Sequence, residues 1–208
     1  MRRRKAQSYL RREPVREPYD RVLIVCEGRK TEPFYFRGLR LHHRLSSAYI
    51  HITPANGSDP ISIVEFAQAR LSNFDRVYCV FDRDGHHNYE AALQKVAQHI
   101  AGQARKLIAI PSWPCFELWL LLHFRYSAAP INRAGRKSSG DRAIDELAQH
   151  WPDYRKSLEN VYVLLSAKLP TALRHAMRLE RENNRTKSRN PSTKVHELVQ
   201  YLTTLKVK

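Results

Sequence analysis

The chain has 208 residues, 42% of them hydrophobic, which is enough for one domain with an ordinary core and excludes disorder throughout. It carries 36 lysines and arginines against 20 aspartates and glutamates, and the formal net charge of +16 favours a polyanion such as DNA or RNA as a partner. Three scattered cysteines are too few for a disulfide framework, and the sequence has no 18-residue apolar span, so we expect a cytoplasmic protein without a membrane segment.

The first half of the chain alternates predicted strands and helices. After a basic arm at 1–18, an apolar run at 21–26 predicts a buried strand, followed by a helix for which Thr31 is the expected cap. The remaining strands are predicted at 49–54, 76–81 and 106–110. Because helical segments separate these strands, the pattern predicts a Rossmann-like α/β core at 19–125 with a mostly parallel, four-stranded sheet flanked by helices.

The second half lacks this alternation. Pro114–Phe124 is apolar nearly all round and predicts a buried helix, and 131–141 is a loop rich in glycine, serine and basic residues. Further helices are predicted at 141–151, 153–165, 170–183 and 192–205. We therefore expect 126–208 to form an α-helical C-terminal extension packed on the core.

Acidic residues follow two of the predicted strands. Glu27 ends the first strand, and Asp82 and Asp84 follow the third. Functional groups gather beyond the carboxyl ends of parallel strands, and two aspartates one residue apart point to the same side. A solvated loop would explain the aspartates alone, but a further acid at a second strand end in a basic chain favours a bound cation. The oxygen ligands suit Mg²⁺ (or Mn²⁺).

Four separated segments resemble a known family. They read VCEGRKTEPFYFRGL, VFDRDGH, PCFELWLLLHF and NPSTKVHELV, over about residues 20–205. A strand ending in Glu-Gly and a later strand ending in Asp-x-Asp resembles the Toprim pattern of topoisomerases, primases and OLD-type nucleases. Together the four segments resemble the RloB-like proteins of prokaryotic restriction and abortive-infection loci. The resemblance implies a Toprim-like fold, with Glu27 as the general acid/base and Asp82 and Asp84 as Mg²⁺ ligands of a phosphodiester-cleaving site.

The third carboxylate of this site stays open. Many Toprim enzymes carry a further acid shortly after the Asp-x-Asp pair, whereas a glycine and two histidines follow here. Glu32 and Glu117 are the candidates. Glu117 interrupts an apolar helix, where an unpaired buried carboxylate would be costly, although an ion pair in the first helical turn explains it equally well.

Basic residues are candidates for contacts with the nucleic acid. Arg29 and Lys30 flank the first carboxylate turn, where Lys30 could also stabilise charge on a reacting phosphate. Four arginines recur at i, i+4, i+7 and i+11 and form one stripe along a helix, as a surface that follows a phosphate backbone would require. These are Arg174, Arg178, Arg181 and Arg185. For Arg29, Lys30 and the stripe, a solvated surface is the alternative. Arg136 and Lys137 lie in the basic loop, for which a disordered connector is the alternative, and Lys194 lies in the last family segment.

The sequence thus favours a Mg²⁺-dependent nuclease that acts as an effector in prokaryotic defence against phage. The resemblance further implies an AAA-type or ABC-type ATPase encoded nearby, and the chain has no GxxxxGK[ST] run of its own. The alternative is a non-catalytic nucleic-acid-binding or sensor module partnered with that ATPase. DNA and RNA are not distinguished, because both present the same phosphates, and the oligomeric state is open.

Overall fold

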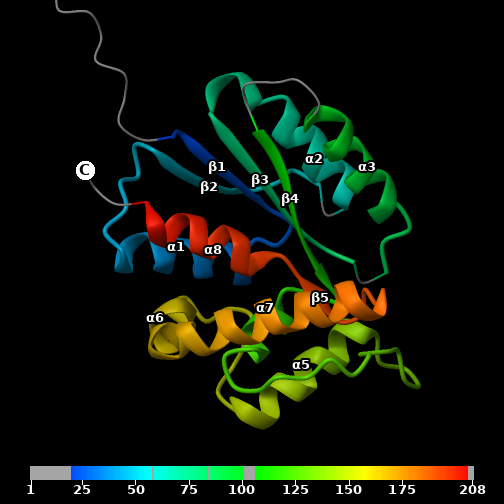
Figure 1. The fold of residues 1–208 in the computed structure, drawn as a ribbon. Helices are drawn as coiled ribbons and strands as arrows, with labels where there is room; N and C mark the ends of the chain where they lie inside the picture. The colour runs from blue at the N-terminus through cyan, green and yellow to red at the C-terminus, as the bar shows by residue number, and fades with distance from the viewer. Residues whose placement is uncertain (1–19, 58, 84, 101–105, 206–208) are drawn as a thin grey trace, which may run out of the picture.

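A five-stranded sheet forms the centre of the molecule (Figure 1). The computed structural model describes residues 20–57, 59–83, 85–100 and 106–205, so the predicted arm at 1–18 and Asp84 lie outside the described residues. The strands are β1 (Val22–Cys26), β2 (Ile50–Pro54), β3 (Arg76–Asp82), β4 (Lys106–Trp113) and β5 (Ser192–Thr193). Their order is β2-β1-β3-β4-β5, with β1 to β4 parallel and β5 antiparallel to β4.

The α/β class and the mostly parallel sheet are confirmed, while the predicted number of four strands was wrong. The additional strand β5 has two residues, too few to show the alternation by which strands are found in a sequence. It belongs to the part of the chain predicted as a helical extension, and it pairs with β4 through Ser112 and Trp113. The division of the chain near residue 125 stays a prediction.

Helices cover both faces of the sheet. They are α1 (Thr31–His42), α2 (Pro60–Gln68), α3 (Tyr89–Ile100), α4 (Glu117–Leu121), α5 (Ser139–His150), α6 (Val161–Leu165), α7 (Leu169–Thr186) and α8 (Val195–Thr204), with 3₁₀ turns at Leu71–Asn73 and Ser166–Lys168. In β1, Leu23 and Val25 belong to the core under α2 and α3, whereas Val22 and Ile24 belong to the core shared with α1 and α8. Both sets are buried, as expected for a central strand whose side chains alternate between two covered faces.

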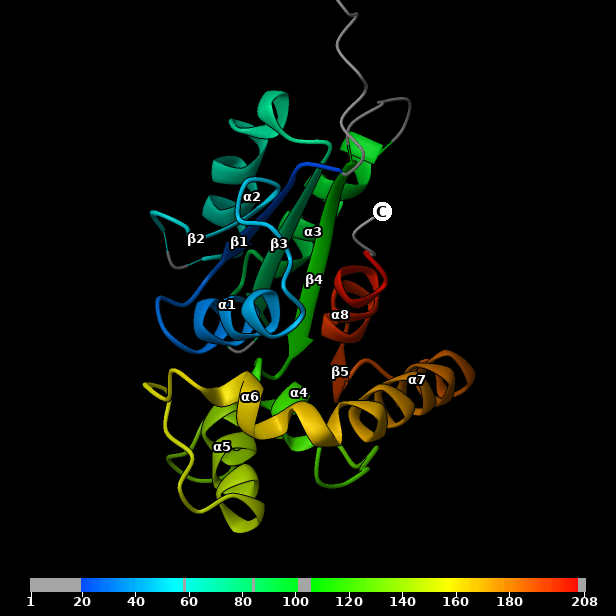
Figure 2. The same ribbon diagram turned by 90° about the vertical axis from the view of Figure 1, so that its left-hand side faces the viewer.

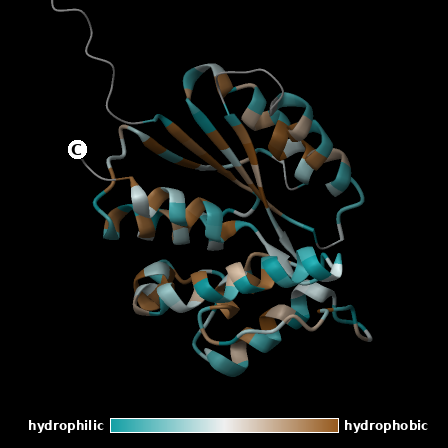
Figure 3. Cartoon of the chain, in the orientation of Figure 1, coloured by the Kyte–Doolittle hydropathy of each residue, from teal (hydrophilic) through white to brown (hydrophobic). Residues whose placement is uncertain are grey.

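The remaining helices lie beyond the carboxyl end of the strands. Figure 2 shows α4, α5, α6 and α7 below the tip of β4, where they form a second layer under the sheet. The hydropathy colouring in Figure 3 is brown along the central strands and largely teal on α7. Parallel strands present functional groups at their carboxyl ends, and this end of the sheet is therefore covered by the helical layer.

An aromatic cluster fixes the start of α1 beside the start of α4. The Tyr35 ring on α1 meets Phe116 and Trp119 edge to face, with centroids 5.6 and 6.3 Å away, and meets Tyr162 of α6 at 5.2 Å. All four side chains are fully buried. Such edge-to-face contacts add to the free energy gained from burying the rings, so the first turns of α1 and α4 are held rigidly together.

Two local predictions were wrong, and tertiary contacts explain both. Thr31 does not cap α1: the cap position is Lys30, which makes no side-chain cap bond, and the Thr31 hydroxyl donates to the Lys156 carbonyl at 3.3 Å. The helix predicted at 153–165 begins only at Val161. The residues before it are turns and loop, and two of them contact the acidic cleft described next.

Candidate active site

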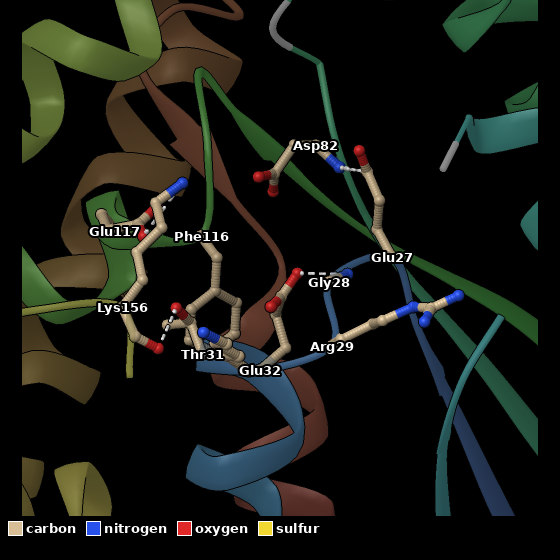
Figure 4. A pocket seen from close by; sticks show the side chains of 10 residues that line it. Glu27, Gly28, Arg29, Thr31, Glu32, Asp82, Phe116, Glu117 and Lys156 are labelled. Atoms are coloured by element: carbon tan, nitrogen blue, oxygen red, sulfur yellow. Dashed lines mark hydrogen bonds and ion pairs between the residues drawn. The ribbon is translucent and has the colours of Figure 1, made fainter. Parts of the chain in front are cut away.

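Four carboxylates line one cleft at the carboxyl end of β1 and β3. They come from the end of β1, the first turn of α1, the end of β3 and the first turn of α4, and are Glu27, Glu32, Asp82 and Glu117. The cleft has a volume of about 360 Å³. Figure 4 shows Glu32 and Asp82 directed into the same space, with Glu117 on the opposite side of it. The fold thus brings together described acidic residues that come from three separate segments of the sequence.

Glu27 is tied to β3 and to the turn that follows it. One carboxylate oxygen, Oε2, accepts a hydrogen bond from the Asp82 backbone N–H at 2.8 Å, and Oε1 lies 3.0 Å from Nε2 of His86. The Glu27 side chain is 15% exposed. Burial raises the pKa of this carboxyl, while the Asp82 amide and the imidazole oppose that rise. A carboxylate paired with a histidine in this way can accept or release a proton in the cleft.

Asp82 lacks a partner for part of its charge. Its Oδ1 atom is buried and makes no hydrogen bond with the described residues. Burial raises the pKa of the Asp82 carboxyl well above its usual range, and the neighbouring carboxylates Glu32, Glu27 and Glu117 raise it further. A buried carboxylate without a partner is costly unless it binds a proton or a cation.

Glu32 lies against the glycine of the turn after β1. Its Oε1 accepts a hydrogen bond from the Gly28 N–H at 3.0 Å. A Cβ atom added at Gly28 would meet the Glu32 carboxylate, so a side chain at this position would displace the carboxylate from where it lies. Burial, together with the charges of Glu117 and Glu27, raises the pKa of Glu32 to about 7.

Glu117 is held by the loop before α6. The Tyr154 hydroxyl donates to Glu117 Oε1 at 2.9 Å, and Lys156 Nζ is 3.7 Å from the same oxygen. Glu117 is only 2% exposed, whereas the Lys156 side chain is 62% exposed and lines the cleft. Glu117 therefore forms the ion pair that explains an acid at this position. Its carboxylate also lines the cleft together with the three other acidic residues.

The cations around the cleft come from two distant parts of the sequence, the turn after β1 and the loop before α6. Arg29 and Lys30 are exposed and line the cleft, although Arg29 extends away from the acids in Figure 4. Lys156 was missed, because the segment around it reads as a helix with its lysine on a solvated face. A signal was present in Pro152, since the residue before a proline disfavours helical backbone and α5 does end at His150.

The comparison with protein families agrees with the resemblance of the four sequence segments. The family model for RloB-like proteins matches residues 22–202, which is most of the chain. The chain belongs to the RloB-like protein family. The resemblance seen in the sequence is thereby confirmed. Comparisons with curated proteins and with solved structures gave no match. Within the described residues, no helix of this RloB-like protein has both the length and the apolar character needed to cross a membrane.

Other basic residues predicted in this RloB-like chain lie away from the cleft. The four arginines of the stripe are exposed along α7: Arg174, Arg178, Arg181 and Arg185. The guanidinium of Arg178 lies over the Tyr126 ring, with its carbon 4.0 Å from the ring centroid. Arg136 is exposed in the loop before α5, and Lys137 Nζ is 2.6 Å from Asp145 Oδ2. Lys194 is paired with Glu180 and Glu197. Nucleic-acid binding by these residues stays a prediction.

Proposed function

We propose that this RloB-like protein is a divalent-cation-dependent nuclease that cleaves phosphodiester bonds of DNA or RNA. The observation that carries the proposal is the cleft of four carboxylates in a chain whose formal net charge is +16. A domain that only binds nucleic acid gains nothing from acids beside the phosphates, because like charges repel. A cation between the carboxylates and the phosphate turns this repulsion into attraction.

The residues of the cleft fit Mg²⁺ or Mn²⁺. Asp82 offers a buried oxygen without a hydrogen-bond partner among the described residues, and Glu27 and Glu32 offer further hard oxygen ligands. Mg²⁺ binds proteins through one or two carboxylates and keeps several waters, so it does not require a closed cage. When bound, the cation would withdraw charge from a phosphate oxygen and lower the pKa of a bound water. Asp84, the second aspartate implied by the resemblance, lies outside the described residues.

The remaining groups of the cleft have roles that follow from their contacts. Glu27, with its raised pKa and its contact to His86, would hold or move the proton of the attacking or leaving oxygen. Lys30 and Lys156 line the cleft, where each would attract the phosphate. Tyr154 fixes the orientation of the Glu117 carboxylate through its 2.9 Å hydrogen bond.

The biological setting is part of the same proposal. Membership of the RloB-like family supports a role in prokaryotic defence, because the sequence segments resemble proteins of restriction and abortive-infection loci. We propose that the nuclease acts in the cytoplasm as an effector and works with an AAA-type or ABC-type ATPase.

The test is a cleavage assay with plasmid, single-stranded DNA and total tRNA in Mg²⁺, Mn²⁺ or EDTA. Wild type is compared with Asp82→Asn and Glu27→Gln, and with Glu65→Gln as a matched control on the exposed surface of α2. We expect cation-dependent cutting by wild type and Glu65→Gln and its loss in both cleft variants. Cutting that survives in Asp82→Asn and Glu27→Gln would contradict the proposal. Binding without cutting, also after addition of the partner ATPase, would instead support a non-catalytic module.

A further inference from the structure

A second pocket lies at the carboxyl end of β3, next to the acidic cleft. It has a volume of about 220 Å³ and is lined by Arg83, Trp113, Arg133 and Asn190, among others. Among the described residues that line it, none is acidic. The described side chains that line the acidic cleft and this arginine-lined pocket therefore differ in the sign of their charge, although both pockets lie at the carboxyl end of β3.

The backbone places the two pockets next to each other. Asp82 and Arg83 are consecutive, so their Cα atoms are about 3.8 Å apart, and consecutive side chains near a strand end point to opposite faces of the sheet. Asp82 lines the acidic cleft and Arg83 the second pocket. The turn after β3 also contacts residues of both pockets. The His86 imidazole contacts Glu27, and the His86 carbonyl accepts a hydrogen bond from Arg83 Nη1 at 3.1 Å.

Arg83 is held in place by aromatic rings. Its guanidinium carbon lies 5.0 Å from the Trp113 ring centroid and 5.2 Å from that of Tyr89, within the range of a cation–π contact. Its Nε is buried and has no hydrogen-bond partner among the described residues. An arginine whose guanidinium is fixed by two rings and one carbonyl is suited to hold an anion at a defined position.

The opposite wall is fixed by Asn190. Its side-chain amide donates to the Ile131 carbonyl at 3.2 Å and to Asn132 Oδ1 at 3.0 Å, while its Oδ1 accepts from the Ile131 N–H at 3.2 Å. These bonds fasten the loop that carries Arg133, which is exposed and lines the pocket. Two arginines thus reach the pocket from two separate parts of the chain, together with the half-buried Trp113 ring.

We propose that this pocket binds the nucleotide adjacent to the scissile phosphodiester, with its phosphate on Arg83 and Arg133 and its base against Trp113. The inference rests on the proposed nuclease function and names its substrate class. A base can stack on a side chain only when it is not paired and stacked in a duplex. The preferred substrate is therefore an unpaired strand, such as single-stranded DNA or an RNA loop.

The experiment measures binding in EDTA, where cleavage does not interfere. Fluorescence anisotropy compares a labelled single-stranded oligonucleotide with a duplex of the same sequence, for wild type, Arg133→Ala, Trp113→Ala and the control Arg37→Ala on the exposed surface of α1. We expect tighter binding of the single strand and a loss of about 5- to 150-fold in Trp113→Ala, the range of one base stack. Arg133→Ala should weaken binding. It should also lower the slope of log affinity against log salt concentration by about one, as the loss of one phosphate contact does. Arg37→Ala should bind as wild type does.

If Trp113→Ala does not fold, tryptophan fluorescence provides a second test of base stacking on Trp113. Binding of the single strand should quench tryptophan fluorescence in wild type, and Trp113→Phe, which keeps a ring, should bind with the quenching largely gone. Trp119 is fully buried, and Trp151 packs against Phe124 and Tyr154 and does not line the pocket, so neither should report stacking there. Unchanged quenching in Trp113→Phe, equal affinity for duplex and single strand, or wild-type binding by Arg133→Ala would overturn the inference. The nuclease proposal fails separately, because it depends on cation-dependent cutting that Asp82→Asn abolishes.

Discussion

Two clusters of acidic residues in this protein differ in how their negative charge is neutralised. The first is the cleft of Glu27, Glu32, Asp82 and Glu117. The second joins α7 to α8, where Glu180, His196 and Glu197 have ligand atoms that all lie within 4.8 Å of one another. By spacing alone the second cluster is the better metal site among the described residues, since the acids of the cleft lie farther apart.

The difference lies in the counter-charge. In the α7–α8 cluster, Lys194 Nζ is paired with both Glu180 and Glu197, and His196 Nε2 is 3.2 Å from Glu180. The hydrogen bond from Lys194 lowers the pKa of Glu180. In the cleft the pKa values of Glu32 and Asp82 are raised instead, by burial and by the charges of neighbouring carboxylates. The α7–α8 cluster is neutralised by its own lysine and ties two helices together, whereas the cleft has charge left for a ligand.

The largest expected effect is on the rate of cleavage, which should depend on the cleft and not on the α7–α8 cluster. Glu27→Gln should lower the rate of phosphodiester cleavage by about 10²- to 10⁴-fold, the usual contribution of a general acid or base. Glu180→Gln makes the same chemical change in the other cluster and should leave the rate near that of wild type. Initial rates on the substrate cut in the panel assay measure both. Equal losses in the two variants would remove the distinction between the clusters.

Cation binding should stabilise the protein through the cleft. Mg²⁺ at about 100 times its Kd should raise the free energy of unfolding by about 2.7 kcal/mol, because it binds the folded state and neutralises the acids. Urea unfolding with and without Mg²⁺ measures this difference. In Asp82→Asn the gain should be absent, and the apo variant should be more stable than the apo wild type, because a buried carboxyl group that requires a proton or a cation is gone. A full Mg²⁺ effect in Asp82→Asn would place the cation elsewhere.

Without a cation, the stability of the protein should fall as the pH rises. The pKa of Glu32 is about 7 in the folded protein, above the ordinary value of 4.5 for a glutamate, so the folded state holds more protons between these pH values. The free energy of unfolding should therefore decrease between about pH 4.5 and pH 7, by on the order of 2 kcal/mol. Urea unfolding in EDTA at pH 5 and pH 8 measures the change, and Glu32→Gln should show a shallower dependence. A stability that increases with pH in EDTA would contradict the raised pKa.

The smallest effect concerns the neutralised cluster. Lys194→Ala leaves Glu180 and Glu197 without their shared cation and should lower the free energy of unfolding by about 1 kcal/mol, the upper range for a partly exposed ion pair. Lys95→Ala, which removes the single contact to Glu65, is the matched control and should cost less. Thermal or urea unfolding compares the two variants. If Lys194→Ala is as stable as wild type, the lysine does not neutralise the cluster in solution.

The sequence predicts the acidic cleft because the information is local. Buried strands show as apolar runs, and parallel strands bring their carboxyl ends to one edge, so Glu27 and Asp82 could be placed together without knowing the rest of the fold. The contacts of Glu117 with Tyr154 and Lys156 join residues 37 and 39 positions apart through a loop that reads as a helix. Likewise, the short strand β5 exists only because β4 lies beside it. Contacts that depend on tertiary packing leave no periodic pattern in the sequence.

The most direct test of the acidic cleft is to titrate the metal-free protein with Mn²⁺ at pH 7.5 by isothermal calorimetry. The measurement does not depend on a substrate or on an activating ATPase. Wild type and Glu180→Gln should bind Mn²⁺ alike, and Asp82→Asn should have lost the site. Binding that survives in Asp82→Asn and disappears in Glu180→Gln would place the cation between α7 and α8 and contradict the role assigned to the cleft.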